Sequence, residues 1–235
     1  MEIFLSELLG TATLIFFGVG TNCANGLRKS YAKGSGWVFI AMGWGFAVLL
    51  GGLVAKPSGG SLNPALTIAL AFEGSVPWDQ VPMYIGGQML GAILGASLAF
   101  FLYYSQFKDQ NGEGGTVGYF ATGPAIADTP VNIFSEFIAT FFLVFAIKVF
   151  GVYDLAGGVG SIFVTFLIMA LGIATGSVTG YALNPARDLG PRIAHAILPI
   201  PNKGDSNWGY TWIPIVAPIL GALAAVILFG AVGIY

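Results

Sequence analysis

The sequence predicts an all-α membrane protein in which six transmembrane helices and two re-entrant half-helices form an inverted repeat. Three observations predict this fold class: a composition too apolar for a water-soluble surface, six apolar segments of membrane-spanning length, and two similar halves that each contain a short apolar segment. Because lipid offers no hydrogen bonds, such a chain must satisfy its backbone polar groups internally.

Composition excludes an ordinary soluble domain. Of 235 residues, 56% are hydrophobic and 9% are charged, and the mean hydropathy is +0.81, whereas a soluble domain carries about 25% charged residues. The formal net charge of −2 gives no basic field for nucleic acid. The single cysteine, Cys23, forms no internal disulfide, and no Cys/His cluster has metal-ligand spacing. We therefore expect a lipid bilayer as solvent, with no nucleic-acid partner, metal or cofactor.

Six long apolar segments are the predicted spanning helices. About 20 helical residues cross about 30 Å of hydrocarbon. The segments are residues 3–23, 37–55, 82–104, 131–152, 159–176 and 211–234. Met1 and Glu2 supply no basic region of a signal peptide, so we expect the first segment to be a retained span.

Two further apolar segments, residues 63–73 and 184–198, are only half as long as a span. Gly-rich turns precede both of them, and non-helical backbone at membrane depth is tolerated only where protein or a watery cavity surrounds it. We therefore predict that both segments enter the membrane without crossing it, and that they border a cavity.

The two halves of the chain resemble each other. The Ser-Glu pair ending at Glu7 recurs at Glu136, 129 residues later, and the Leu-Asn-Pro-Ala unit around Asn63 recurs around Asn184, 121 residues later. Because each half contains three spans, the copies must have opposite orientations, a pattern that places a shared site at the bilayer midplane. We predict one domain over residues 1–235, with repeat halves at 1–105 and 131–235 and a connecting loop at 106–130.

The repeated Asn-Pro-Ala motif begins each short segment. Asn is a preferred N-cap, and Pro suits the first helical position because its missing N–H has no intrahelical partner there. The residues are Asn63, Pro64 and Ala65, then Asn184, Pro185 and Ala186. Half-helices entering from opposite faces would present both N-termini to the membrane centre, where the two asparagine amides donate hydrogen bonds and the positive helix ends disfavour cations.

This paired motif resembles the signature of the major intrinsic proteins, the aquaporin and aquaglyceroporin family, and the resemblance covers essentially the whole chain. It implies six tilted helices and two half-helices in a right-handed bundle, one pore per protomer and usually a homotetramer. It also implies that backbone carbonyls before each motif line the path. These residues are Gly59, Gly60 and Ser61, then Gly180, Tyr181 and Ala182.

The resemblance assigns a selectivity filter to Arg187, Tyr181, Gly172 and a residue of the second span. Arg187 directly follows the second motif, and an arginine at membrane depth indicates a pore or cavity position. Tyr181 would face the carbon skeleton of a polyol while Arg187 binds its hydroxyls. Gly172 contributes no side chain, whereas the resemblance implies a histidine at this position in water-selective members of the family. We therefore expect a pore wider than a single water molecule.

The filter position in the second span has two candidate residues. Pairing residues 43–45, Gly-Trp-Gly, with the Gly-x-Gly of the family selects Met42, whereas ungapped counting back from Asn63 selects Gly43. We predict Met42, which departs from the tryptophan of many glycerol facilitators. A flexible thioether there would give a wider slot.

Three other residues resemble those found at the same positions in the glycerol-facilitating branch of the family. Asp188 follows the filter arginine, and Pro214 and Ile215 replace the Tyr-Trp pair typical of water channels. We expect Asp188 to support the filter.

The two apolar-span carboxylates, Glu7 and Glu136, have two interpretations. By resemblance they accept hydrogen bonds from the backbone of the half-helix loops, and this is the role we predict. Intramembrane carboxylates are also used as proton relays in coupled transporters. His195 is predicted to be a packing residue, with pH gating as the alternative.

The predicted function is passive conduction of small uncharged solutes, above all glycerol and water, with dihydroxyacetone, other small polyols and neutral lactic acid as bulkier candidates. The alternatives are a water-selective channel and a proton-coupled carrier. No nucleotide loop or Ser/His/Asp set has the context that an enzyme needs, so we predict no enzymatic activity.

The resemblance places both termini in the cytoplasm of a cell-membrane protein. Positively charged residues usually favour the cytoplasmic side, yet this orientation puts Arg28, Lys29, Lys33 and Lys108 outside and only Lys56 and Lys148 inside. We keep the family orientation because the half-helix motif is more specific than four loop charges.

Overall fold

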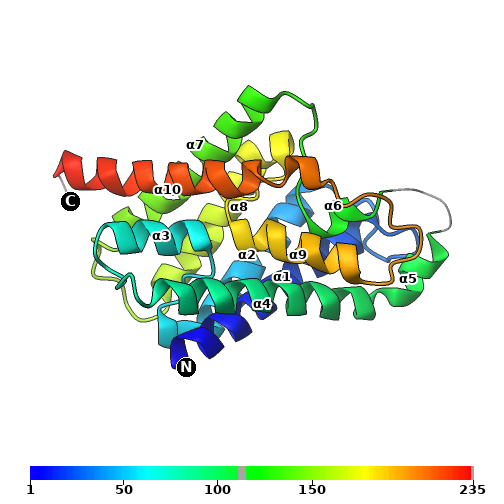
Figure 1. Cartoon of the computed structure of the whole chain (residues 1–235), viewed down its shortest axis with the longest axis horizontal. Helices are drawn as coiled ribbons and strands as arrows, with labels where there is room; N and C mark the ends of the chain where they lie inside the picture. The colour runs from blue at the N-terminus through cyan, green and yellow to red at the C-terminus, as the bar shows by residue number, and fades with distance from the viewer. Residues whose placement is uncertain (111–114, 234–235) are drawn as a thin grey trace.

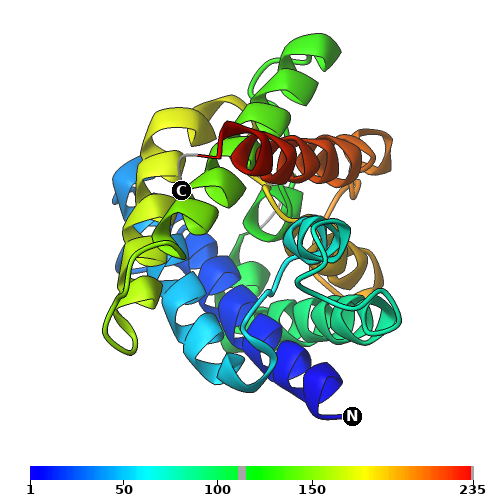
Figure 2. The same ribbon diagram turned by 90° about the vertical axis from the view of Figure 1, so that its left-hand side faces the viewer.

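A computed structural model describes residues 1–110 and 115–233, and in these residues the regular structure is helical (Figure 1). Six of the described helices are long and apolar enough to cross a membrane. They are α1 (Glu2–Gly26), α2 (Trp37–Val54), α4 (Val81–Leu102), α7 (Thr129–Phe150), α8 (Val159–Thr179) and α10 (Ile213–Val232). The predicted all-α fold with six spans is confirmed, and α1 begins at the end of the molecule where α10 finishes (Figure 2).

The two half-helices are α3 (Pro64–Phe72) and α9 (Pro185–Ile197). At 9 and 13 residues they are about 14 and 20 Å long, too short to cross a bilayer. The side chain of Asn63 caps α3 by accepting from the Ala65 N–H, and that of Asn184 caps α9 by accepting from the Ala186 N–H. The two helices lie in line between α4 and α10 (Figure 1), with α9 behind α3 in the end-on view of Figure 2.

Two short helices lie around the predicted connecting loop: α5 (Tyr104–Asp109), which begins at the end of the first half, and α6 (Val117–Phe120) within the loop. Residues 111–114 of the predicted connecting loop and residues 234–235 at the end of the second half lie outside the described residues. The repeat boundaries themselves remain a prediction.

A stripe of glycines brings α4 against α1. A Cβ added at Gly91 would overlap the carbonyl oxygen of Leu8, one at Gly95 would overlap that of Ala12, and one at Gly87 would lie 2.5 Å from that of Phe4. Lipid tails are as apolar as the side chains, so helices in a membrane associate through close backbone packing at small residues. In the other half, Gly221 of α10 lies against the Phe137 carbonyl of α7 in the same way.

Several charged groups are buried in this protein, while many large apolar residues lie on its outer surface. Glu7, Glu136, Arg192 and His195 are each 0% exposed, whereas large apolar residues on all six long helices face outward. Charged side chains at membrane depth are costly unless they face the interior of the bundle. The interior is therefore where the functional groups of this chain are placed.

Candidate functional site

The N-termini of α3 and α9 meet through a reciprocal pair of hydrogen bonds. Asn63 Nδ2 donates to the carbonyl of Leu183 at 2.9 Å, and Asn184 Nδ2 donates to the carbonyl of Leu62 at 2.7 Å. Each amide has two N–H groups, so each retains one beyond this bond. Both asparagines line the same cavity. The structure thus brings the two motif asparagines together at one cavity.

The loops before the half-helices adopt left-handed backbone conformations. Gly59, Gly60 and Gly180 have φ values of 87°, 69° and 86°, which glycine adopts without strain. Leu62 and Leu183 both have φ of 55°, a conformation that costs a non-glycine residue roughly 1–2 kcal/mol. The surrounding contacts must hold these two residues in place.

The two intramembrane carboxylates provide that hold. Glu7 accepts from the N–H groups of Ser61 (3.1 Å) and Leu62 (2.8 Å), and Glu136 accepts from those of Ala182 and Leu183, both at 3.0 Å. A hydroxyl also donates to each carboxylate at 2.6 Å, from Ser58 to Glu7 and from Thr179 to Glu136. In the first half, Gln88 Nε2 also donates to Glu7, at 2.7 Å. The two carboxylates therefore occupy equivalent places in the two halves.

Two cavities among the described residues lie on either side of the filter region. The α3-side cavity, about 620 Å³, is bordered by Asn63, Asn184 and the loops before them. The α9-side cavity, about 420 Å³, is bordered by Asn22, Thr122 and Gly180 among others. Only three described side chains line both: Trp44, Tyr181 and Arg187. These three residues form the boundary between the two cavities.

The residues predicted to supply pore carbonyls lie along these cavities. Gly59, Gly60, Ser61 and Ala182 line the α3-side cavity, Gly180 lines the α9-side cavity and Tyr181 lines both. The remaining motif residues, Pro64, Ala65, Pro185 and Ala186, are buried in the first turns of α3 and α9 and are not among the lining residues.

Arg187 packs its guanidinium against the indole of Trp44. The guanidinium carbon lies 3.7 Å from the centre of the ring, and Nη1 donates to the Phe120 carbonyl at 3.4 Å. A cation over an aromatic face is attracted by the ring quadrupole. Arg187 is only 5% exposed, and these two contacts hold its guanidinium beside the indole ring.

The structure contradicts both candidates for the filter position in the second span. Met42, which was predicted, and Gly43, which was the alternative, are both wrong. The Met42 side chain is 44% exposed on the outer surface, and it is not among the residues that line the described cavities. A Cβ at Gly43 would overlap Thr21 of α1, and one at Gly45 would lie 2.6 Å from Met169 of α8. Since α2 packs against both neighbours through these glycines, the tryptophan between them points inward.

The missing side chain of Gly172 was expected to widen the bore, but in the structure the space beside Gly172 is filled. A Cβ there would lie 2.9 Å from Tyr181 Cζ, and one at Gly176 would lie 2.5 Å from Tyr181 Cδ1. The tyrosine ring therefore occupies the space that both glycines leave on α8. Trp37 completes the arrangement, because its Nε1 donates to the Gly172 carbonyl at 2.7 Å and its ring meets Tyr181 edge-on.

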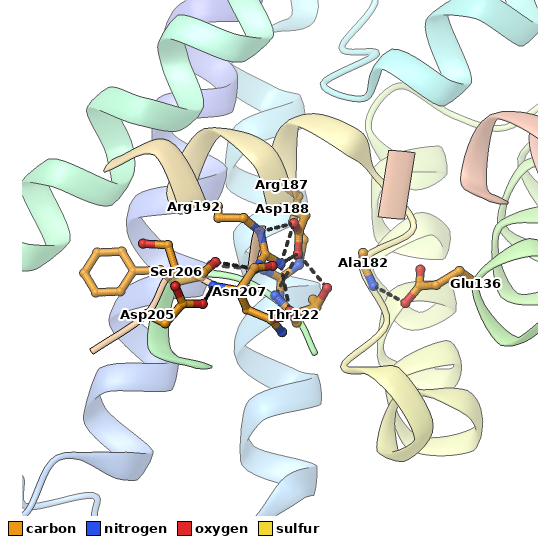
Figure 3. Close-up of polar contacts among 10 residues, drawn as sticks. Thr122, Glu136, Ala182, Arg187, Asp188, Arg192, Asp205, Ser206 and Asn207 are labelled. Atoms are coloured by element: carbon orange, nitrogen blue, oxygen red, sulfur yellow. Dashed lines mark hydrogen bonds and ion pairs between the residues drawn. The ribbon is translucent and has the colours of Figure 1, made fainter. Parts of the chain in front are cut away.

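A buried ion pair behind Arg187 ties three segments together (Figure 3). Asp188 accepts from Arg192 Nε at 2.9 Å and from the N–H and hydroxyl of Thr122 at 2.8 and 2.6 Å. Arg192 also donates to the carbonyls of Thr122, Ser206 and Asn207 at 2.8–3.0 Å. Arg192 Nη2 also donates to Asp188 Oδ2 at 2.9 Å, so all five guanidinium N–H groups are used. Sequence reasoning identified Asp188 but missed Arg192, although its i+4 spacing on a half-helix was a readable signal.

His195 lies beside this clamp and outside the candidate spans. Its ring nitrogens lie 2.8 Å from the hydroxyls of Thr116 and Ser206. Burial, with smaller contributions from Lys203 and Arg192, lowers the pKa of His195 from 6.5 to about 4. The described residues contain no group of three or more His, Cys, Asp or Glu that would hold a metal ion.

The chain is similar to known proteins both in sequence and in structure. A profile of the family described as "Major intrinsic protein" matches residues 1–229. The chain is 48% identical to the glycerol uptake facilitator protein of Bacillus subtilis strain 168 over 98% of its own length and 85% of the relative. It is 46% identical to the protein of the same description from Streptococcus pneumoniae strain R6, over 97% and 98%. The crystal structure of the aquaglyceroporin from Plasmodium falciparum superposes with a TM-score of 0.86 at 31% identity, covering 97% of this chain and 94% of that one.

Proposed function

Because this chain belongs to the major intrinsic protein family, we propose that it is a passive channel for glycerol, water and similar small uncharged solutes, and that it has no enzymatic activity. The relatives described as glycerol uptake facilitators match over nearly its full length. The observation that carries the proposal is the boundary of Trp44, Tyr181 and Arg187 between two cavities.

The filter has one apolar wall and one polar wall. Trp44 and Tyr181 offer aromatic carbon to the C–H groups of a polyol, and Arg187 offers N–H donors to its hydroxyls. A solute that passes reaches Asn63 and Asn184, whose remaining N–H groups replace part of its hydration. Neutral molecules with several hydroxyls fit this sequence of donors and apolar surface.

Charge selection follows from the same groups. The guanidinium of Arg187 and the N-terminal ends of α3 and α9 place positive potential along the path. Cations would therefore be repelled at both the filter and the centre. With Trp44 rather than Met42 at the filter, the argument for a wider slot no longer stands, so neutral lactic acid and dihydroxyacetone are candidates to be measured.

The two alternatives are less well supported. A water-selective channel is not favoured by the relatives described as glycerol uptake facilitators, which are 46–48% identical over nearly the full chain. A proton-coupled carrier needs carboxylates that release protons to the path, whereas Glu7 and Glu136 are 0% exposed and accept bonds that hold the loops. Their arrangement supports an anchoring role.

We also propose a homotetramer in the cell membrane with cytoplasmic termini. The exposed ion pairs of Arg28 and Lys29 with Asp109 partly neutralise the positive charge on the opposite face. This pairing weakens the charge argument against the orientation. Native mass spectrometry in detergent tests the assembly, and labelling of cysteines introduced at loop positions in intact cells tests the orientation.

Stopped-flow light scattering of proteoliposomes tests the transport function. We expect glycerol and water permeability well above that of protein-free vesicles, with no accumulation above the outside glycerol concentration at any pH gradient. The control is Glu7→Gln with Glu136→Gln in a preparation shown to be folded. Loss of a pH-driven accumulation in that variant would establish the carrier, and water flux without glycerol flux would establish the water-selective channel.

A further inference from the structure

Asn22 is a polar residue of α1 to which the filter assignment gives no role. Its Oδ1 accepts a hydrogen bond from the indole N–H of Trp44 at 3.1 Å. Its Nδ2 donates to the carbonyl of Tyr119 in α6, also at 3.1 Å. Asn22 itself lines the α9-side cavity. It thus connects Trp44 to α6, whose Tyr119 also lines the α9-side cavity.

The position of Trp44 depends on three contacts. Its ring lies against Gly18, where an added Cβ would overlap the ring, and its face meets the Arg187 guanidinium at 3.7 Å. The bond to Asn22 fixes the remaining degree of freedom, which is the direction of the indole N–H. A buried N–H without an acceptor costs about 1–3 kcal/mol, so without Asn22 the ring would turn to reach another acceptor or water.

We propose that Asn22 is a positioning residue that sets the selectivity of the filter through Trp44. By occupying the indole N–H, Asn22 keeps that donor away from the solute, and Trp44 presents only aromatic carbon opposite the hydroxyl-binding Arg187. The proposal rests on the proposed channel function for its biological meaning, but the orientation of Trp44 can be measured independently of transport.

The test compares Asn22→Leu, which is close in size but has no acceptor, with the wild type. We expect the ratio of glycerol to water permeability to change by about three- to tenfold, which corresponds to about 0.7–1.4 kcal/mol at the barrier. Asn25→Leu is the matched control, because Asn25 lines the same cavity but accepts from the Gly36 N–H on the adjoining loop. Its ratio should stay at the wild-type value.

A double-mutant cycle separates positioning from general packing. In a Trp44→Phe background there is no indole N–H, so adding Asn22→Leu should leave the permeability ratio unchanged. If Asn22→Leu altered the ratio equally in both backgrounds, or lowered both fluxes in parallel, Asn22 would be only a packing residue and the proposal would be overturned.

An NMR measurement gives a readout that does not depend on glycerol conduction. The indole ¹H–¹⁵N resonance of Trp44 in detergent is assigned by its loss in Trp44→Phe. Asn22→Leu should shift this resonance and speed its exchange with solvent, whereas Asn25→Leu should not. An unchanged resonance would refute the role of Asn22 even if the wild-type protein conducted glycerol, and absence of glycerol flux in the wild type would refute only the channel proposal.

Discussion

At the residue scale, two side chains of the proposed filter occupy space left by glycines. Trp44 fits against Gly18, and Tyr181 covers Gly172 and Gly176. These glycines affect the passage indirectly, because their missing side chains determine where two aromatic rings lie. A single added methyl group at such a position therefore moves a ring rather than narrowing the path by itself.

Gly172→Ala should lower glycerol permeability more than water permeability. The added Cβ would lie within 2.9–3.0 Å of the Tyr181 ring and hydroxyl, and overpacking of this kind typically costs about 1–3 kcal/mol. Since the neighbouring helix cannot move away easily, we expect Tyr181 to shift toward Trp44 and Arg187. Proteoliposome swelling with glycerol and water measures the ratio.

Gly209→Ala is the matched control, because no described atom lies within 4 Å of a Cβ added there. It should conduct as the wild type does. Equal losses of glycerol and water permeability in Gly172→Ala would contradict the place given to Tyr181.

The buried clamp gives a second prediction at this scale. Among the described residues, Arg192→Leu leaves Asp188, which is 0% exposed, with the two Thr122 donors alone. Removing one partner of a buried ion pair costs about 3–5 kcal/mol, so the thermal unfolding temperature in detergent should fall sharply. Arg192→Lys keeps the charge but not the forked donors, and it should give an intermediate value.

Arg28→Leu provides the comparison at an exposed ion pair, in which the arginine side chain is 42% accessible. Its unfolding temperature should stay close to that of the wild type. If Arg192→Leu were as stable as Arg28→Leu, the clamp would contribute nothing to the fold.

At the element scale, α1 and α4 pack backbone against backbone along the glycine stripe. Gly91→Ala should destabilise the folded protein by about 1–3 kcal/mol, because a Cβ there overlaps the Leu8 carbonyl and the helices must separate. The yield of monodisperse protein and its unfolding temperature measure the effect.

Gly86→Ala tests whether position, rather than loss of glycine, is responsible. Its added Cβ would make an ordinary 3.5 Å contact with the Phe4 ring, and alanine favours a helix relative to glycine. This variant should be at least as stable as the wild type. Equal destabilisation by both substitutions would mean that the stripe is not the contact surface.

At the scale of the whole molecule, His195 joins α9 to the segments around Thr116 and Ser206. Its protonation therefore affects the contacts among these three parts of the chain. Its pKa is lowered to about 4 from 6.5. The unfolded state therefore binds a proton first as pH falls. The free energy of unfolding should decrease between about pH 6.5 and pH 4, by at most about 1.4 kcal/mol per pH unit, and this contribution should be constant above that range.

Thermal unfolding of the detergent-solubilised protein from pH 7.5 to pH 4.5 measures this slope. His195→Gln removes the titrating group, so its unfolding temperature should depend less on pH than that of the wild type. Parallel curves for the two proteins would show that His195 does not contribute to acid sensitivity.

The amino-acid sequence by itself determined the architecture. Apolar segments of full and half length must respectively cross and enter a bilayer, and an Asn followed by Pro fixes where each half-helix begins. These are local properties of the chain, so the six spans and the helices starting at Pro64 and Pro185 could be predicted. The positions of Glu7 and Glu136 were readable for the same reason, since the repeat places them alike.

Only the tertiary structure decided which side chains face the passage. Helix α2 is apolar around its whole circumference, so its sequence does not encode how it is rotated, and Met42 could not be distinguished from Trp44. Contacts of Gly43 with α1 and of Gly45 with α8 fix that rotation. The burial of Arg192 among carbonyls from distant segments and the ring of Tyr181 over Gly172 likewise depend on packing between elements, which no local pattern specifies.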